Sequence, residues 1–179
     1  MAFLVQTDPP ADAANSYVSV ADFQAYCDDR SMDYSASDEA GQQSALVKAT
    51  QYLDVRFKYV GYRKSSTQQT EWPRSAAYNS RGDRLTGIPV CVQHATIEYA
   101  FRALTTPLLD DPERDASGQV VKTRSETVGP ISERIEMSER LGFLLPAYPL
   151  ADALLTSQGI ARDPNAGAYG LSSGSLGRS

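Results

Sequence analysis

A chain of 179 residues allows one domain with short appendages, and 41% hydrophobic and 22% charged residues are ordinary for a globular protein. No apolar run approaches the roughly 20 residues of a membrane helix, and the first residues lack the basic stretch of a signal peptide. We therefore expect a protein of the reducing cytoplasm without a membrane span, with Cys27 and Cys91 as buried thiols. The net charge of −5 argues against strong binding to a phosphate backbone, which requires clustered Lys and Arg.

Residues 1–14 are expected to form an extended N-terminal arm, because Asp8-Pro9-Pro10 excludes a regular helix there. The arm is expected to dock on the body of the protein or on a neighbour. A first helix should run from about residue 20 to Arg30, since Ser19 and Asp22 form a variant of the capping box.

A second helix is expected between an N-cap at Ser37 and an end before Gly61. Its apolar residues recur at helical spacing, which is typical of a helix packed on a core. They are Leu46, Ala49, Leu53 and Phe57.

Residues 62–87 are too polar for a helix or a buried strand and are expected to form a long loop. Trp72 should plug the edge of the core and pin the loop, while Trp and Arg are also typical of interface hot spots. The two interpretations are compatible, and together they place a subunit interface at Trp72, Arg74, Arg81 and Arg84.

A third helix should begin at Ile88-Pro89, because proline is favoured in the first helical turn, and end near Thr105. His94 lies beside its apolar face without clustered ligands, so it is expected to be a packed, hydrogen-bonded residue and not a metal ligand.

The remaining chain changes character twice. Residues 108–118 are expected to be a solvated acidic loop, and residues 119–137 a β-hairpin that packs on the helices or pairs with other subunits. A short helix should start between Pro146 and Pro149 and pack Leu150, Leu154 and Leu155 on the body. From residue 159 to 179 a Gly- and Ser-rich tail is expected, either disordered or ordered in the groove of a partner.

The predicted fold is mainly α: a small bundle of about four helices at residues 15–158, with a β-hairpin and extended terminal arms. The chain contains no nucleophile elbow, phosphate-binding glycine loop, CxxC pair or HExxH motif. We therefore expect no enzyme and no catalytic, metal or cofactor site.

Several stretches in order resemble the small head–tail connector (adaptor) proteins of tailed bacteriophages, whose relatives are also described as DnaT-like single-stranded DNA-binding proteins. The resemblance covers roughly residues 15–137. The stretches are Asn15-Ser16-Tyr17-Val18-Ser19-Val20-Ala21-Asp22-Phe23, Ala49-Thr50-Gln51-Tyr52-Leu53-Asp54, Glu71-Trp72-Pro73-Arg74-Ser75, Gly87-Ile88-Pro89 with its helix, and Lys122 to Ile131.

The resemblance implies a structural protein of the virion neck, assembled in the host cytoplasm. Such adaptors form a homo-oligomeric ring, expected to be twelvefold, below the portal protein. The ring extends the DNA channel, lets the genome pass without specific binding, and carries the stopper or tail protein. The C-terminal segment of such proteins reaches the portal, which here implies docking by Tyr169, Leu171, Leu176 and Arg178.

The alternative is a single-stranded DNA-binding module that uses the loop of residues 59–84. Its phosphate contacts would be Arg63, Lys64, Arg74, Arg81 and Arg84, and its stacking residues Tyr59, Tyr62, Trp72 or Tyr78. A capsid-decorating or tail-completion protein on a similar fold is a third possibility.

Overall fold

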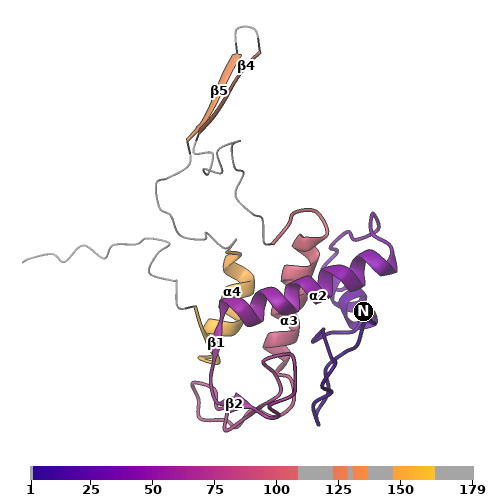
Figure 1. The fold of residues 1–179 in the computed structure, drawn as a ribbon, viewed down its shortest axis with the longest axis vertical. Helices are drawn as coiled ribbons and strands as arrows, with labels where there is room; N and C mark the ends of the chain where they lie inside the picture. The colour runs from indigo at the N-terminus through magenta and orange to yellow at the C-terminus, as the bar shows by residue number, and fades with distance from the viewer. Residues whose placement is uncertain (1, 109–122, 129–130, 137–146, 164–179) are drawn as a thin grey trace, which may run out of the picture. The chain divides into compact units, whose positions relative to one another are not determined.

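The computed structural model describes residues 2–108, 123–128, 131–136 and 147–163 (Figure 1). The chain divides into two compact units. The main unit contains the described residues up to Leu108 and those from Ala147 onward, and the second unit is Leu109–Pro146.

Four helices make up most of the regular structure of the described residues, which confirms the prediction of a small, mainly α fold. They are α1 (Val20–Asp28), α2 (Glu39–Arg56), α3 (Val90–Ala103) and α4 (Pro149–Thr156). α3 packs against both α2 and α4. The core between them is apolar and aromatic, and its largest fully buried side chains include Tyr17, Phe23, Leu46, Tyr52, Leu53, Phe57, Trp72 and Tyr99. No helix in the described ranges has the length and apolar composition to cross a bilayer.

The N-cap residues of α1 and α2 show which local sequence signals determine where each helix begins. The predicted cap of α1 is confirmed: Ser19 Oγ accepts a hydrogen bond from Asp22 N at 3.1 Å and donates to the Asp22 carboxylate at 2.6 Å. For α2 the predicted cap at Ser37 is wrong by one residue, because Asp38 Oδ1 accepts from Gly41 N at 2.8 Å. A carboxylate caps as well as a hydroxyl and also interacts favourably with the helix dipole.

α4 begins within the predicted interval, but its packing face is only partly as predicted. Leu155 is fully buried, as expected, together with Ala151, whereas Leu150, which was also expected in the core, is 58% exposed. Five of the eight residues of this two-turn helix are apolar, at spacings of both three and four, so its sequence does not single out one face.

Two pairs of two-residue strands hold the loop of residues 62–87 and the segment after α4 in place. β1 (Lys58–Tyr59) pairs with β6 (Ala161–Arg162), and β2 (Tyr62–Arg63) pairs with β3 (Arg74–Ser75), both antiparallel. Ile160 is fully buried beside β6. The expected tail boundary at residue 159 is therefore too early, since the chain stays packed as far as Asp163; the rest of the predicted tail lies outside the described residues.

The N-terminal arm docks on the body of its own chain, one of the two expected outcomes. Val5 forms a parallel bridge with Ser16, and Gln6 Nε2 donates to Thr70 Oγ1 at 2.8 Å. Asp8 pairs with Lys64. The arm thus links the first residues to the loop of residues 62–87.

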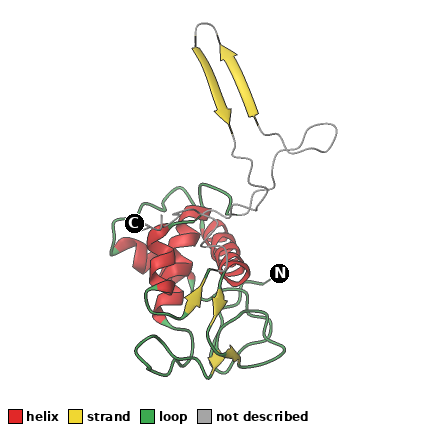
Figure 2. Cartoon of the chain, turned by 90° about the vertical axis from the view of Figure 1, so that its left-hand side faces the viewer, coloured by secondary structure: helices red, strands yellow, loops and turns green. Residues whose placement is uncertain are grey.

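The second unit contains the predicted β-hairpin. β4 (Thr123–Val128) pairs antiparallel with β5 (Ile131–Glu136), with Val128 opposite Ile131 (Figure 2). The predicted acidic loop of residues 108–118 lies outside the described residues apart from Leu108.

A buried arginine connects three helices and β6 in the main unit. Arg56, at the end of α2, is only 3% exposed. Its guanidinium donates to Asp163 Oδ2 at 2.9 and 3.1 Å and to Asp152 Oδ2 at 2.7 Å, and it also donates to Tyr99 Oη. Tyr99 Oη in turn donates to Asp152. The positive charge is compensated by two carboxylates that lie about a hundred residues away in the sequence.

Replacing Arg56 by Met should destabilise the main unit by roughly 3–5 kcal/mol, because the two carboxylates lose the buried charge that compensates them. Urea unfolding monitored by circular dichroism measures this loss. Lys48→Met, at an exposed site of the same helix, is the matched control and should change stability by no more than about 0.5 kcal/mol. Equal midpoints for the two variants would show that the network does not stabilise the fold.

Candidate functional site

The loop of residues 62–87 is anchored by Trp72. The indole is fully buried and its ring contacts the Tyr59 ring edge-on, with 5.9 Å between centroids. The Trp72 backbone N–H donates to Tyr17 Oη at 3.0 Å. Trp72 therefore plugs the edge of the core, as the sequence predicts, and is not itself a surface residue.

A carboxyl group joins this anchor to the helices. Asp54 of α2 accepts from Tyr17 Oη at 2.6 Å and from the backbone N–H of Glu71 at 3.0 Å. Burial raises the pKa of Asp54 to about 7, and the two donated hydrogen bonds oppose that shift. One side chain thus holds α2, the segment before α1 and the start of the Trp72 turn together.

Arg74 is used to hold the loop. Its Nε donates to Val60 O at 2.8 Å, Nη2 donates to Gly61 O at 2.7 Å, and Nη1 pairs with the Glu71 carboxylate. The side chain is only 9% exposed. A contact of Arg74 with a neighbouring subunit stays a prediction, but the guanidinium is already taken up by groups of its own chain.

Gly61 makes the close approach of the two loop branches possible. Its φ of +72° lies in the left-handed region, and a Cβ at this position would overlap the carbonyl oxygen of Ser75. Another residue there would separate β2 from β3.

These internal contacts leave an exposed set of basic and aromatic side chains, which we call the loop surface. Tyr62 and Tyr78 are 63% and 50% exposed. Tyr78 forms a backbone bridge with Arg84, and the turn between them is closed by Asn79, which accepts from Asp83 N at 2.9 Å. The exposed members of the loop surface are Lys58, Tyr62, Arg63, Tyr78, Arg81, Arg84 and Arg162.

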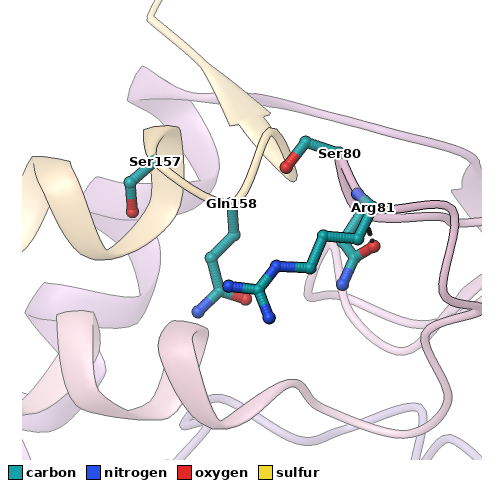
Figure 3. A pocket seen from close by; sticks show the side chains of 5 residues that line it. Ser80, Arg81, Ser157 and Gln158 are labelled. Carbon is teal, nitrogen blue, oxygen red and sulfur yellow. Dashed lines mark hydrogen bonds between the residues drawn. The ribbon is translucent and has the colours of Figure 1, made fainter.

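A polar cleft of about 320 Å³ lies where the loop meets the end of α4. Ser80 N donates to Gln158 O at 2.8 Å and fixes the two segments together. The side chains of Arg81 and Gln158 extend toward each other in the cleft, with Ser80 above them and Ser157 to their left in the view of Figure 3. Asn79 completes the lining. The cleft offers hydrogen-bond donors to a polar group, and it presents neither a nucleophile paired with a base nor metal ligands.

Half of the aromatic residues expected to stack on bases are unavailable for that role. Tyr59 is 9% exposed and Trp72 is fully buried, so neither presents a ring face to a ligand. That part of the alternative is wrong, because the two rings complete the core. The stacking candidates that remain are Tyr62 and Tyr78.

The rare residues of α3 are packing residues. The ring of His94 lies on that of Tyr26, with 4.8 Å between centroids, and burial lowers the pKa of His94. Cys27 and Cys91 are free and buried, which confirms the expectation of buried thiols. Within the described part of the chain no group of three or more His, Cys, Asp or Glu residues could hold a metal ion. The four predicted tail contacts, Tyr169, Leu171, Leu176 and Arg178, lie outside the described residues.

Arg56 and Asp54, the polar residues that organise the helices and the loop, were not predicted from the sequence. For Arg56 the available signal was its place beside Phe57 and three residues after Leu53, which puts it on the buried side of α2.

The sequence model of one protein family, described as "Putative DnaT-like ssDNA binding protein", matches residues 1–169. The chain belongs to this family. The match includes the N-terminal arm and the second unit as well as the helical body. No curated protein and no solved structure shows a significant match. The predicted relation to proteins of the DnaT-like description is confirmed at the level of the family, and the head–tail adaptor identity stays a prediction.

The buried carboxyl of Asp54 should make stability depend on pH. Its folded pKa of about 7 lies above the usual value of about 4, so between these two values the folded state holds a proton that the unfolded state releases. The free energy of unfolding should therefore fall as pH rises from about 4 through 7, and the advantage of the wild type over Asp54→Asn should shrink over the same range.

Urea midpoints at a series of pH values test this effect, with the exposed Asp29→Asn as a carboxylate-to-amide control. A difference between the wild type and Asp54→Asn that stays constant from pH 4 to 8 would contradict the raised pKa.

Proposed function

We propose that the chain is a structural adaptor of the neck of a tailed phage, without catalytic activity. Copies of the chain would form a ring below the portal, extend the DNA channel and carry the stopper or tail. The observation that carries the proposal is the loop of residues 62–87, which buried residues hold in place while it displays Tyr62, Tyr78, Arg81 and Arg84 without ion pairs among the described residues. Exposed Tyr and Arg on a fixed backbone are typical of protein–protein interfaces.

The charge of the chain supports the same role. A channel that releases DNA quickly should not hold phosphates, and a net charge of −5 per subunit disfavours such binding. Lys64 and Arg74, two of the five cations considered for phosphate contacts, pair with Asp8 and Glu71.

The hairpin of the second unit supports a role in assembly. Its two six-residue strands pair only with each other in the described structure. A two-stranded sheet is marginal in isolation and its open edges recruit partners. In a neck it would pack on an adjacent subunit or on the next ring.

The tail gives the first test. A chain that ends after Asp163 keeps Ile160, β6 and the Arg56 network, so it should fold and still lose binding to portal rings of the same phage. A full-length variant in which Tyr169, Leu171, Leu176 and Arg178 are all replaced by Ser tests these predicted contacts at constant length. It should lose portal binding as well. Co-sedimentation with purified portal and electron microscopy of the complex measure the result. Undiminished binding of both variants would rule out the tail as the portal contact.

A second candidate function, binding of single-stranded DNA, is favoured by the description of the family and by the exposed Tyr62 and Tyr78 beside arginines. Fluorescence anisotropy with a labelled thymidine oligomer separates the two candidates. An adaptor should show no tight binding at physiological salt. A DNA-binding module should bind with an affinity that falls steeply with salt, and Tyr62→Ala and Tyr78→Ala should each cost about 1–3 kcal/mol while Lys48→Ala leaves stacking intact.

A further inference from the structure

Charge is distributed very unevenly along this chain. Residues 58–84 contain six Lys or Arg and only two acidic side chains, whereas all other residues together contain eleven basic and twenty acidic side chains. A chain of net charge −5 therefore carries one strongly basic segment.

The basic segment forms one end of the main unit. It follows the C-terminal end of α2, and β6 brings Arg162 beside it, opposite Lys58 in the β1–β6 ladder. Lys58, Arg63, Arg81, Arg84 and Arg162 are all exposed, and none of them makes an ion pair among the described residues. The acidic residues near them are partly taken up: Asp83 accepts from Asn79 and Asp8 pairs with Lys64.

An acidic end lies at the other end of the same helix. The end of α1, the following turn and the start of α2 present five exposed carboxylates that make no ion pair among the described residues. The only cation of this stretch, Arg30, lies over the ring of Tyr26. The carboxylates are Asp28, Asp29, Asp33, Asp38 and Glu39.

α2 separates the two ends. Its 18 residues span about 27 Å, with the acidic end at its N-terminus and β1, followed by the loop surface, at its C-terminus (Figure 1). This separation exceeds the screening length of about 8 Å at physiological salt, so the two ends of one molecule do not neutralise each other.

We propose that the basic end of one copy docks on the acidic end of a second copy. The contact is head-to-tail, with different surfaces meeting, and such contacts generate closed rings when the rotation between copies closes. Tyr62 and Tyr78 supply apolar contact area between the arginines, and the charges fix the orientation of the pair. This pairing would be the subunit contact of the proposed adaptor ring. The closed ring rests on the proposed function, whereas the pairing of two copies does not.

A second copy fits the basic end better than nucleic acid does. A nucleic acid strand that follows the basic end would be repelled by the remainder of an acidic chain. Neighbouring copies instead neutralise both ends, since each molecule offers one basic and one acidic surface.

Charge reversal tests the pairing. Arg81→Glu/Arg84→Glu cancels the excess of positive charge at the basic end, and Asp28→Lys/Asp29→Lys cancels the excess of negative charge at the acidic end. Neither change should unfold the chain, because all four side chains are exposed and basic residues are favoured at the C-terminal end of a helix such as α1. Each double variant alone should self-associate about tenfold more weakly than the wild type at low salt. An equimolar mixture of the two should recover the loss, and so should the chain that carries all four changes.

Sedimentation velocity over a concentration series at low and at high salt measures association, and Lys48→Glu, a reversal midway along α2, is the matched control and should behave as the wild type. Failure of the mixture to associate better than either variant alone would overturn the pairing, as would wild-type association that is insensitive to salt. Wild-type association that occurs only after single-stranded DNA is added would overturn the pairing and assign the basic end to nucleic acid.

Portal binding distinguishes this inference from the proposed function. If the double variants still assemble normal rings on portal, the adaptor role stands and the pairing is wrong. If the variants show the charge-swap pattern but neither they nor the wild type binds portal, the pairing stands and the adaptor role is wrong.

Discussion

Arg56 is a charge in the interior of a small helical unit, and the arrangement of α2, α3 and α4 depends on how that charge is compensated. Desolvating a guanidinium is costly unless carboxylates and hydroxyls surround it. Here Asp152, Asp163 and Tyr99 do so, and each belongs to a different part of the chain. The packing of α4 and the end of β6 is therefore fixed by a polar contact as much as by apolar burial, since Leu155 and Ile160 are the main apolar contacts there.

A second hydrogen-bond network, centred on Asp54, connects the helices to the loop of residues 62–87. Asp54 lies two residues before Arg56 on α2, and it receives hydrogen bonds from Tyr17 and from the backbone next to Trp72. Arg74 then ties β3 back to Val60 and Gly61. A long polar loop thus acquires a defined conformation, with the short β2–β3 pair as its regular structure. A defined conformation is what a repeated subunit contact requires, because each copy must present the same surface.

Much of the fold follows from local sequence signals. The Ser19–Asp22 cap, the apolar spacing of α2 and the proline at the start of α3 each act over a few residues, and each predicted its helix correctly. The errors involve choices between near-equivalent local options. Ser37 and Asp38 are both good caps, and α4 has apolar residues on more than one face, so only contacts with the rest of the chain decide between them.

The candidate site was harder to predict from the sequence than the fold, because it depends on contacts between distant residues. Composition placed arginines and aromatic residues in one loop, but it did not separate those that face inward from those that face outward. Trp72 meets Tyr17, the ring of Tyr59 meets that of Trp72, and Arg74 meets Val60. None of these contacts joins residues that are local neighbours in the sequence.

By itself, the sequence determined a mainly helical chain with an acidic net charge, a basic loop and a hairpin, because helix periodicity, caps, turns and charge are properties of neighbouring residues. Only the tertiary structure decided which cations remain free, that Arg56 is buried, that the chain stays packed to Asp163, and that the basic and acidic ends lie at opposite ends of α2. Those outcomes depend on contacts between residues far apart in the chain, whose energies no local pattern contains.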